Sequence, residues 1–149
     1  MAPVSGRLVP FSSWAEWSAV AAGLLCDRGD ACVAALQRVA TWRGRGGKLP
    51  LAVDCTALLV EASLQDTAFG PCVPPYSPLS EAGLRSLYAL AVVRLVNGVT
   101  DPQQKGRFAA PVATLARNAG LPPLLVDVRH EVRSCESHRT CWHCTCRLS

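Results

Sequence analysis

Apolar residues recur every three or four positions along most of this chain, which is the spacing of one face of an α-helix. The first such stripe covers residues 14–26. Ser13 precedes it and Glu16 follows Ser13 by three positions, which is the spacing of a capping box at a helix start. The second covers residues 30–42, where Asp30 is placed to cap the first turn. The pattern therefore predicts two amphipathic helices in the first part of the chain.

A third stripe, over residues 51–65, follows a proline, which is a residue tolerated at a helix start. The longest stripe covers residues 81–97. Ser80 can cap its first turn, and Asn97–Gly98 offers a left-handed residue to close its last one. We therefore expect the longest helix of the fold to end at Asn97.

Prolines cluster between these two helices, and proline removes backbone donors and disfavours both helix and sheet. We predict an internal linker over residues 67–79, with a proline-rich ligand for a partner's aromatic groove as the alternative. Two shorter helices are predicted over residues 111–120 and from Pro122 onward. No segment shows the sustained alternation of a strand, so the predicted fold class is all-α, a bundle of about five to six helices.

Half of the residues are hydrophobic, and a length of 149 residues fits one domain with a packed helical core. The net charge of +4 permits an anionic partner without requiring one. The first residues lack a signal-peptide pattern, and no uninterrupted apolar run reaches the roughly 18 residues of a membrane span. We expect a soluble intracellular chain with no membrane partner, whose free thiols pack as small apolar groups at Cys26, Cys32, Cys55 and Cys72.

The densest basic segment contains Arg43, Arg45 and Lys48 among glycines. Its cations and bare backbone N–H groups could contact the phosphates of RNA. A solvated loop between two helices is the interpretation we favour, because clustered glycines disfavour helix. The segment is not a nucleotide-binding P-loop, since the Gly-Lys-Ser/Thr ending and the preceding strand are missing.

Arg129 and His130 are adjacent on the last predicted helix, beside the apolar run that packs it. The guanidinium keeps its charge and can hold a phosphate with two donors, whereas the imidazole can exchange a proton near neutral pH. The pair suits phosphodiester chemistry, although ordinary exposed helix faces carry similar pairs.

Several separated segments resemble, in the expected order, the Las-type ribosome-biogenesis proteins, which are endoribonucleases of the HEPN class. They are Thr41–Arg43, Leu49–Val53, Leu87–Asn97 and Val126–Glu131. We therefore assign residues 1–131 to one HEPN-like helical domain. The resemblance implies metal-independent, cofactor-free cleavage of the second internal transcribed spacer of pre-ribosomal RNA, for large-subunit biogenesis.

The resemblance also implies roles for the motif residues. Arg129 would be the cation that stabilises the phosphate, and His130 a catalytic or phosphate-orienting imidazole. Two motif helices would meet in a homodimer, and a polynucleotide 5′-kinase would phosphorylate the 5′-hydroxyl product. We expect the regions that dock this kinase to lie outside the sequence. A nuclear and nucleolar location is implied in the same way.

The motif departs from the family pattern Arg-His-x-x-Thr-His after its first two residues. Arg133 stands at the threonine position and Ser134 at the second histidine position. A serine hydroxyl is too weakly basic to replace an imidazole near pH 7, and losing an acid or base costs about a hundredfold to ten-thousandfold in rate. We therefore expect weak or absent cleavage. A non-catalytic dimerisation or interaction module of the same complex is the alternative function.

Residues 132–149 form a Cys/His-rich tail that we expect to be disordered. Four soft ligands, Cys135, His138, Cys141 and Cys144, make a zinc site one interpretation and a small zinc-binding protein a third functional class. We favour a segment without selected structure, such as one from an alternative exon, because zinc modules usually pair two knuckles around a longer spacer.

Overall fold

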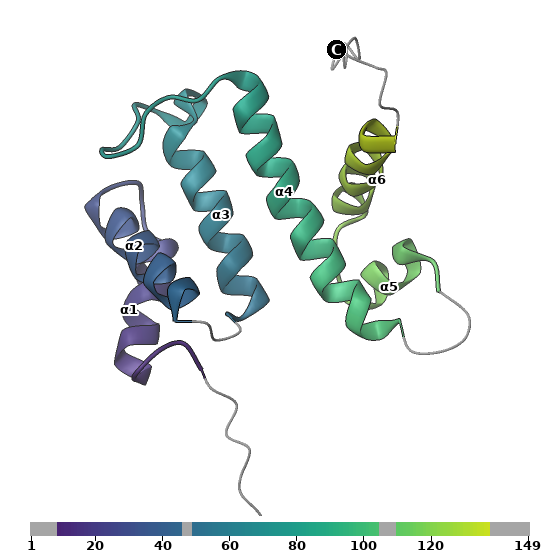
Figure 1. Ribbon diagram of the computed structural model, residues 1–149, viewed down its shortest axis with the longest axis horizontal. Helices are drawn as coiled ribbons and strands as arrows, with labels where there is room; N and C mark the ends of the chain where they lie inside the picture. The colour runs from purple at the N-terminus through teal and green to yellow at the C-terminus, as the bar shows by residue number, and fades with distance from the viewer. Residues whose placement is uncertain (1–8, 46–48, 105–109, 138–149) are drawn as a thin grey trace, which may run out of the picture. The chain divides into compact units, whose positions relative to one another are not determined.

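The computed structural model of the chain describes residues 9–45, 49–104 and 110–137. Within these ranges the chain forms six α-helices, two short 3-10 helices and no strand, which confirms the predicted all-α class (Figure 1). The chain divides into two compact units, Met1–Ala91 and Val92–Ser149, and the division falls inside a helix.

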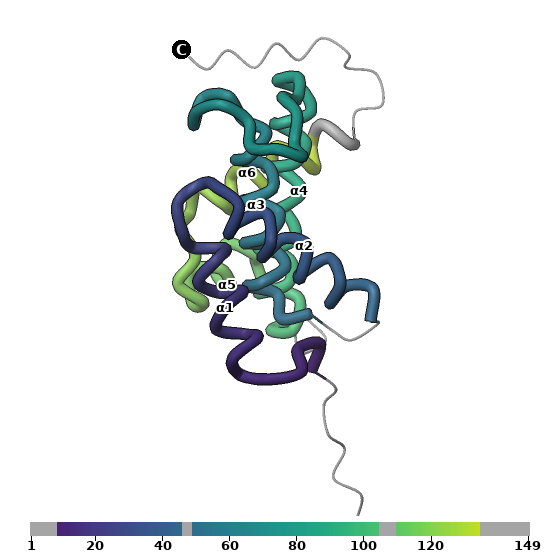
Figure 2. The backbone as a smooth tube through the Cα atoms, turned by 90° about the vertical axis from the view of Figure 1, so that its left-hand side faces the viewer, coloured from purple at the N-terminus to yellow at the C-terminus, as the bar shows by residue number. Residues whose placement is uncertain are grey.

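The first unit is built on three helices that Figures 1 and 2 both show grouped together. They are α1 (Trp14–Leu24), α2 (Asp30–Gly44) and α3 (Leu51–Gln65), followed by the 3-10 helix η1 (Thr67–Phe69). The predicted bounds of α3 are confirmed, whereas α1 ends before Cys26 and α2 runs on to Gly44. Asp30 lies in the first turn of α2 and not at its N-cap, which is Gly29.

The core of this unit surrounds Trp42, the largest side chain that is fully buried. Its ring stacks on that of Trp17, with the centroids 6.3 Å apart and the planes at 9°, and Phe11 packs against both rings. Aliphatic side chains from the three helices complete the cluster: Val20, Leu24, Leu36, Val39, Val53 and Leu64. Aromatic rings remove a large apolar area from water when they are buried, so this cluster holds the three helices together.

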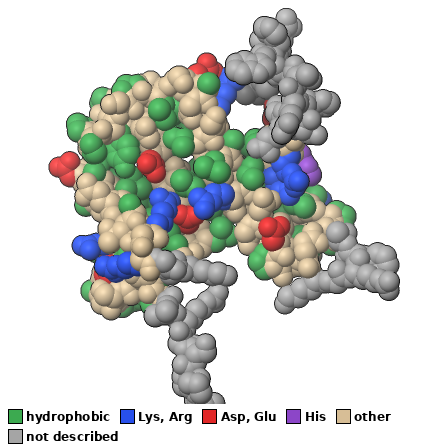
Figure 3. Space-filling model, viewed as in Figure 1, with side chains coloured by type: hydrophobic (Ala, Val, Ile, Leu, Met, Phe, Trp, Pro, Cys, Tyr) green, Lys and Arg blue, Asp and Glu red, His purple; other side chains and the backbone are tan. Residues whose placement is uncertain are grey.

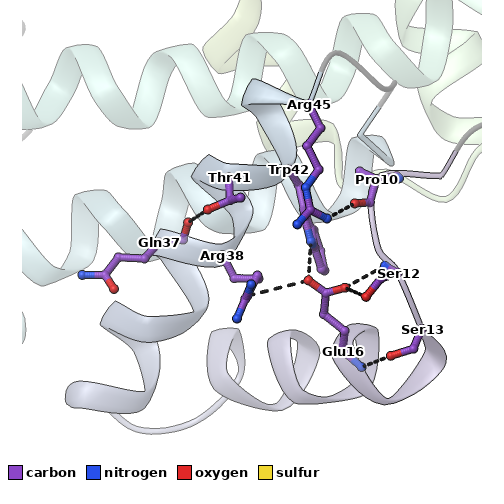
Figure 4. Close-up of polar contacts among 9 residues, drawn as sticks. All are labelled: Pro10, Ser12, Ser13, Glu16, Gln37, Arg38, Thr41, Trp42 and Arg45. Carbon is purple, nitrogen blue, oxygen red and sulfur yellow. Dashed lines mark hydrogen bonds and ion pairs between the residues drawn. The ribbon is translucent and has the colours of Figure 1, made fainter.

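The polar end of the Trp42 indole binds Glu16 on α1 (Figure 4). Its Nε1 donates to Glu16 Oε1 at 3.0 Å, while Ser12 donates its N–H and its hydroxyl to Oε2 at 2.7 and 2.6 Å. Ser13 Oγ accepts from the Glu16 N–H at 3.1 Å, which confirms the hydroxyl half of the predicted capping box. The carboxylate half differs, because Glu16 binds Ser12 and the core indole.

These contacts lower the pKa of Glu16 from an ordinary value of 4.5 to about 2, and the Ser12 hydroxyl contributes most, followed by the Ser12 N–H and the Trp42 indole. Desolvation opposes the shift, and Arg38, whose Nε lies 3.7 Å from Oε1, adds a smaller favourable contribution. A carboxyl whose pKa is lower in the folded than in the unfolded chain stabilises the fold above its unfolded pKa. This stabilisation is lost as the pH falls from about 4.5 toward 2.

The segment predicted as a linker over residues 67–79 contributes contacts to the first unit. It begins as η1, where Asp66 Oδ1 accepts from the Ala68 N–H at 2.9 Å. Val73 and Tyr76 are half-buried against the core, and the Leu79 N–H donates to the backbone carbonyl of residue 65. The proline-rich chain therefore covers part of the core.

The longest helix, α4 (Glu81–Thr100), contributes to both units. Ser80 Oγ accepts from the Gly83 N–H, which confirms the predicted cap. The predicted stop at Asn97 is wrong, because the helix continues to Thr100, a fully buried residue whose hydroxyl donates to the Val96 carbonyl at 2.9 Å. Burial of this last turn offsets the roughly 1 kcal/mol that a glycine costs inside a helix.

With the 3-10 helix η2 (Asp101–Gln103) added, the segment Glu81–Gln103 has the length and mean hydropathy of a membrane-crossing helix. Within the described ranges it is the one segment that does. Core helices of soluble proteins share both properties, and this segment also carries the exposed Arg85 and Arg94. Length and hydropathy alone therefore do not place α4 in a membrane.

The second unit combines the end of α4 with α5 (Val112–Asn118) and α6 (Pro123–Ser137). Gly120 closes α5 with φ of +77°, a left-handed conformation that favours glycine. The Leu121 N–H donates to the Ala116 carbonyl at 2.9 Å across this turn, so α6 follows α5 directly. Residues 132–137, which we expected in a disordered tail, are helical, and residues 138–149 lie outside the described ranges.

We predict that Glu16→Gln lowers the melting temperature at pH 7, because the amide keeps some hydrogen bonds but loses the charge that lowers the carboxyl pKa. The difference in melting temperature between the variant and the natural chain should narrow as the pH approaches 3, because the stabilisation from the charged carboxylate decreases there. Thermal unfolding followed by circular dichroism across this pH range measures the two melting temperatures.

Glu81→Gln is the matched control. Its carboxylate pairs with Arg85 at 2.6 Å on the exposed face of α4, a kind of pair worth about 0.3–0.5 kcal/mol. If the loss of melting temperature depended on pH equally in both variants, the result would contradict the stabilising role given to the Glu16 carboxylate.

Candidate functional site

Arg129 is the most deeply buried charged residue of the described part of the chain, with 5% of its surface exposed. It lies in the middle of α6, on the side that meets α4. Its Nε donates to Oδ1 of Asn97 on α4 at 2.6 Å, so one short hydrogen bond joins α6 to the end of α4 within the second unit.

The chemistry of this contact matters because Asn97 is uncharged. A carboxylate partner would neutralise the guanidinium, whereas an amide oxygen fixes its orientation and leaves its positive charge intact. A buried charge is expensive to maintain, and such groups gather at functional sites more often than elsewhere. Arg129 is thus a fixed cation held in place by a neutral group.

His130 points to solvent, although it is the next residue along the helix. Successive helical residues are turned by about 100° from each other, which separates the buried arginine from the exposed imidazole. The structure therefore presents His130, and not Arg129, to a molecule that approaches α6 from solvent.

Ser134 lies one turn beyond His130 on the same face of α6 and is also exposed. Its hydroxyl donates to the His130 carbonyl at 2.9 Å. Because α6 runs on to Ser137, the position that holds the second histidine in the family pattern is helical here. The backbone of the motif is therefore present, and what differs at position 134 is the side chain.

Two of the three predicted RNA-binding cations are engaged within the first unit. Arg43 pairs with Asp54, with Nη2 2.7 Å from Oδ1, and Arg45 Nη1 donates to the Pro10 carbonyl at 3.0 Å. Lys48 lies outside the described residues. On the face shown in Figure 3, basic side chains alternate with acidic and apolar ones and do not form one continuous field.

The predicted zinc ligands fall almost entirely outside the described residues. The backbone of Cys135 is helical, and His138, Cys141 and Cys144 belong to the stretch that the structure does not describe. Among the residues it does describe, no group of three or more His, Cys, Asp or Glu side chains is placed to hold a metal ion.

Sequence reasoning missed Asn97 as a member of the site. Because Asn-Gly commonly closes helices, the local sequence predicts a helix stop at Asn97. An amide within the uncharged run of residues 95–99 is the signal that the sequence offers, because buried polar side chains are hydrogen-bonded in native structures. The partner itself, Arg129, is too distant in sequence for spacing to reveal it.

The all-helical fold and the Arg-His pair on α6 agree with the class of protein that the sequence resembles, the Las-type ribosome-biogenesis proteins. The sequence profile described as Las1-like matches residues 9–144, so the chain belongs to the Las1-like family. This confirms the family resemblance. The match extends through part of the Cys/His-rich tail.

Individual relatives agree with this assignment. The chain is 37% identical over 128 residues to the ribosomal biogenesis protein LAS1L of Mus musculus, and this alignment covers 85% of the chain. It is 40% identical over 97 residues to protein LAS1 of Saccharomyces cerevisiae and 27% identical over 94 residues to the pre-rRNA-processing protein las1 of Schizosaccharomyces pombe. The chain spans only 15%, 19% and 17% of the length of these three relatives.

We predict that Asn97→Ala destabilises the chain by about 1–3 kcal/mol, because it leaves a buried guanidinium N–H without its acceptor. Urea unfolding followed by circular dichroism measures the change. Asn118→Ala, at the exposed end of α5, is the control and should change stability little.

Arg129→Met combined with Asn97→Ala completes a double-mutant cycle. The double variant should lose less stability than the sum of the single ones, since neither partner is then left unpaired. Strict additivity would mean that the hydrogen bond does not couple the two helices.

Proposed function

We propose that this chain is the helical nuclease region of a Las1-type ribosome-biogenesis protein, which acts on the second internal transcribed spacer of pre-ribosomal RNA. Two relatives support the pathway, since one is named a ribosomal biogenesis protein and another a pre-rRNA-processing protein. The same pathway favours a nuclear and nucleolar location.

The observation that carries the catalytic part of the proposal is the buried guanidinium of Arg129, which is anchored to a neutral amide oxygen. RNA cleavage without a metal needs a base to remove the proton from the 2′-hydroxyl, a cation for the charge that builds on the phosphate, and an acid for the leaving oxygen. Arg129 supplies the cation, whose positive charge acts on the phosphate from beneath the surface at which His130 is exposed. His130, exposed on the same helix, supplies one imidazole, and the products are a cyclic phosphate and a 5′-hydroxyl.

We propose further that cleavage is impaired in this chain. Acid–base catalysis needs two proton-transfer groups, and the second position is occupied by Ser134, whose proton is donated to a backbone carbonyl. His130 is thus left without the imidazole that the family pattern places one turn away. Loss of one such group costs about a hundredfold to ten-thousandfold in rate.

Assembly with other chains belongs to the same proposal. A homodimer would form where the motif helices of two chains meet, and the exposed face of α6 also carries Leu124, which is 68% exposed. A polynucleotide 5′-kinase would then process the new 5′ end. The regions that dock this kinase are expected in the parts of the longer relatives that this chain does not span.

One observation favours a second function, a non-catalytic interaction module of the same complex. Arg129 is 5% exposed and its Nε is already bound to Asn97, so in this state the guanidinium serves the packing of α6 against α4. A module of this kind needs the helical surface for pairing but no acid–base pair.

We predict that rebuilding the motif restores cleavage. The natural chain is compared with the triple variant Val132→Leu, Arg133→Thr, Ser134→His on a short spacer RNA in the presence of a chelator. The rebuilt chain should cut at least about a hundredfold faster, because it regains the second imidazole. Adding His130→Ala to it should abolish cleavage without changing the melting temperature, since this side chain is exposed.

The other outcomes separate the proposals. If the natural chain cuts at the rebuilt rate and His130→Ala abolishes that activity, the impairment is refuted while the nuclease assignment stands. If neither chain cuts, although both sediment as dimers, this chain is not a nuclease by itself: cleavage requires further regions or the kinase partner, and the result favours the interaction module.

A further inference from the structure

Two cysteines of the first unit meet at the turn between α1 and α2. The Sγ atoms of Cys26 and Cys32 lie 3.6 Å apart. Cys32 is buried in the first turn of α2, with 2% of its surface exposed, whereas Cys26 lies beyond the end of α1 and is exposed to solvent. The expectation that Cys26 is a packed thiol inside a helix is therefore wrong, and the pair combines a reachable sulfur with a protected one.

The close approach of α1 and α2 keeps this pair together. A Cβ atom added at Gly23 would lie 2.8 Å from Ala35 Cβ and 2.9 Å from the Ala31 carbonyl oxygen, so only glycine allows the helices to come this near. Gly23 is buried three residues before Cys26, and Ala31 directly precedes Cys32. The separation of the two sulfurs is thus set by backbone packing and not by flexible side chains alone.

The surroundings of the two sulfurs differ in a way that assigns them different roles. Cys26 Sγ lies 3.1 Å from the Gly23 carbonyl oxygen and 3.2 Å from that of Asp27. Burial raises the pKa of the Cys32 thiol, and the neighbouring Cys26 thiol raises it further. Cys32 is therefore shielded and ionises less readily, while Cys26 is exposed to any reagent dissolved in the solvent.

We propose that Cys26 and Cys32 form an oxidation site, at which a peroxide oxidises the exposed sulfur and the buried one then closes an intramolecular disulfide. This dithiol site is separate from α6 and does not depend on nuclease activity. It explains why two thiols are held in contact at the surface end of a helical hairpin.

The chemistry balances with one molecule of hydrogen peroxide. The Cys26 thiolate attacks one peroxide oxygen, the O–O bond breaks, and the departing hydroxide takes a proton to become water, leaving a sulfenic acid on Cys26. Cys32 Sγ then attacks this sulfur, and the displaced hydroxide leaves as water with the Cys32 proton. Two thiols lose two electrons, and one peroxide becomes two waters.

The geometry permits this closure with a small movement. The sulfurs must approach from 3.6 Å to about 2.05 Å, the length of a disulfide bond. The residues between the cysteines form a turn that includes Gly29, and α1 ends before Cys26, so the exposed cysteine is not held inside a helix. Rotation of the Cys26 side chain with adjustment of the turn is sufficient.

Peptide mapping of the full chain tests the proposal directly, because Arg28 lies between the two cysteines. Trypsin cleavage after Arg28 places Cys26 on the peptide 8–28 and Cys32 on the peptide 29–38, each with a single cysteine. After mild treatment with hydrogen peroxide and blocking of free thiols, these two peptides should be recovered as one disulfide-linked species. Cys26→Ser or Cys32→Ser should abolish it.

Cys55→Ser is the matched control, because Cys55 is as buried as Cys32 but belongs to α3. It should leave the yield of the linked peptides unchanged. Gly23→Ala should lower that yield at least severalfold if it pushes α1 and α2 apart, and its circular dichroism spectrum shows whether the chain has kept its fold.

A second measurement separates native geometry from simple closeness in sequence. In glutathione buffers, the equilibrium constant for closing the pair should be at least about tenfold higher in the native chain than in guanidinium, and the oxidised chain should melt a few degrees higher by the same linkage. Equal constants in both states would overturn the proposal. So would oxidation that stops at a Cys26 sulfenic or sulfinic acid, or that joins Cys26 to a cysteine of the tail.

Discussion

The first unit depends on burying the Trp42 indole without leaving its N–H unpaired. The ring supplies the largest buried surface of the core, and stacking on Trp17 with Phe11 at its edge fixes its orientation. An indole N–H in an apolar core costs free energy unless an acceptor reaches it. Glu16 provides that acceptor from the first turn of α1, and its own backbone N–H is capped by the Ser13 hydroxyl, so one residue joins the start of α1 to the packing of α2.

The second unit also buries a polar group that needs a hydrogen-bond partner, and here the group is a cation. A guanidinium is buried at the centre of α6, and an amide from α4 takes up its Nε hydrogen. In both units one polar group crosses between helices at the place where apolar packing alone would leave a hydrogen-bonding atom unsatisfied. The difference is that Glu16 remains in contact with solvent-facing serine groups, whereas Arg129 keeps its charge beside a neutral partner.

Periodicity predicted the helical class and the bounds of α3, because local spacing determines which face of a helix is apolar. It failed where a distant residue decides the outcome. Asn97–Gly98 has the local chemistry of a helix end, but burial of Thr100 and the contact with Arg129 carry α4 further. The contact of Cys26 with Cys32 escaped prediction for another reason, since it depends on how closely two helices approach at Gly23. The Arg-His pair was visible in the sequence, whereas the opposite exposure of its two members was not.

That opposite exposure has a consequence for how the motif changes over generations. A substitution at Arg129 removes a buried hydrogen bond between α6 and α4, whereas a substitution at His130 or at position 134 changes a side chain that is exposed to solvent. In a lineage released from selection for cleavage, we expect the exposed positions to drift first while the arginine is retained for the sake of the fold. The survival of this arginine in a related sequence is therefore evidence of a folded α6 and not, by itself, of a working nuclease.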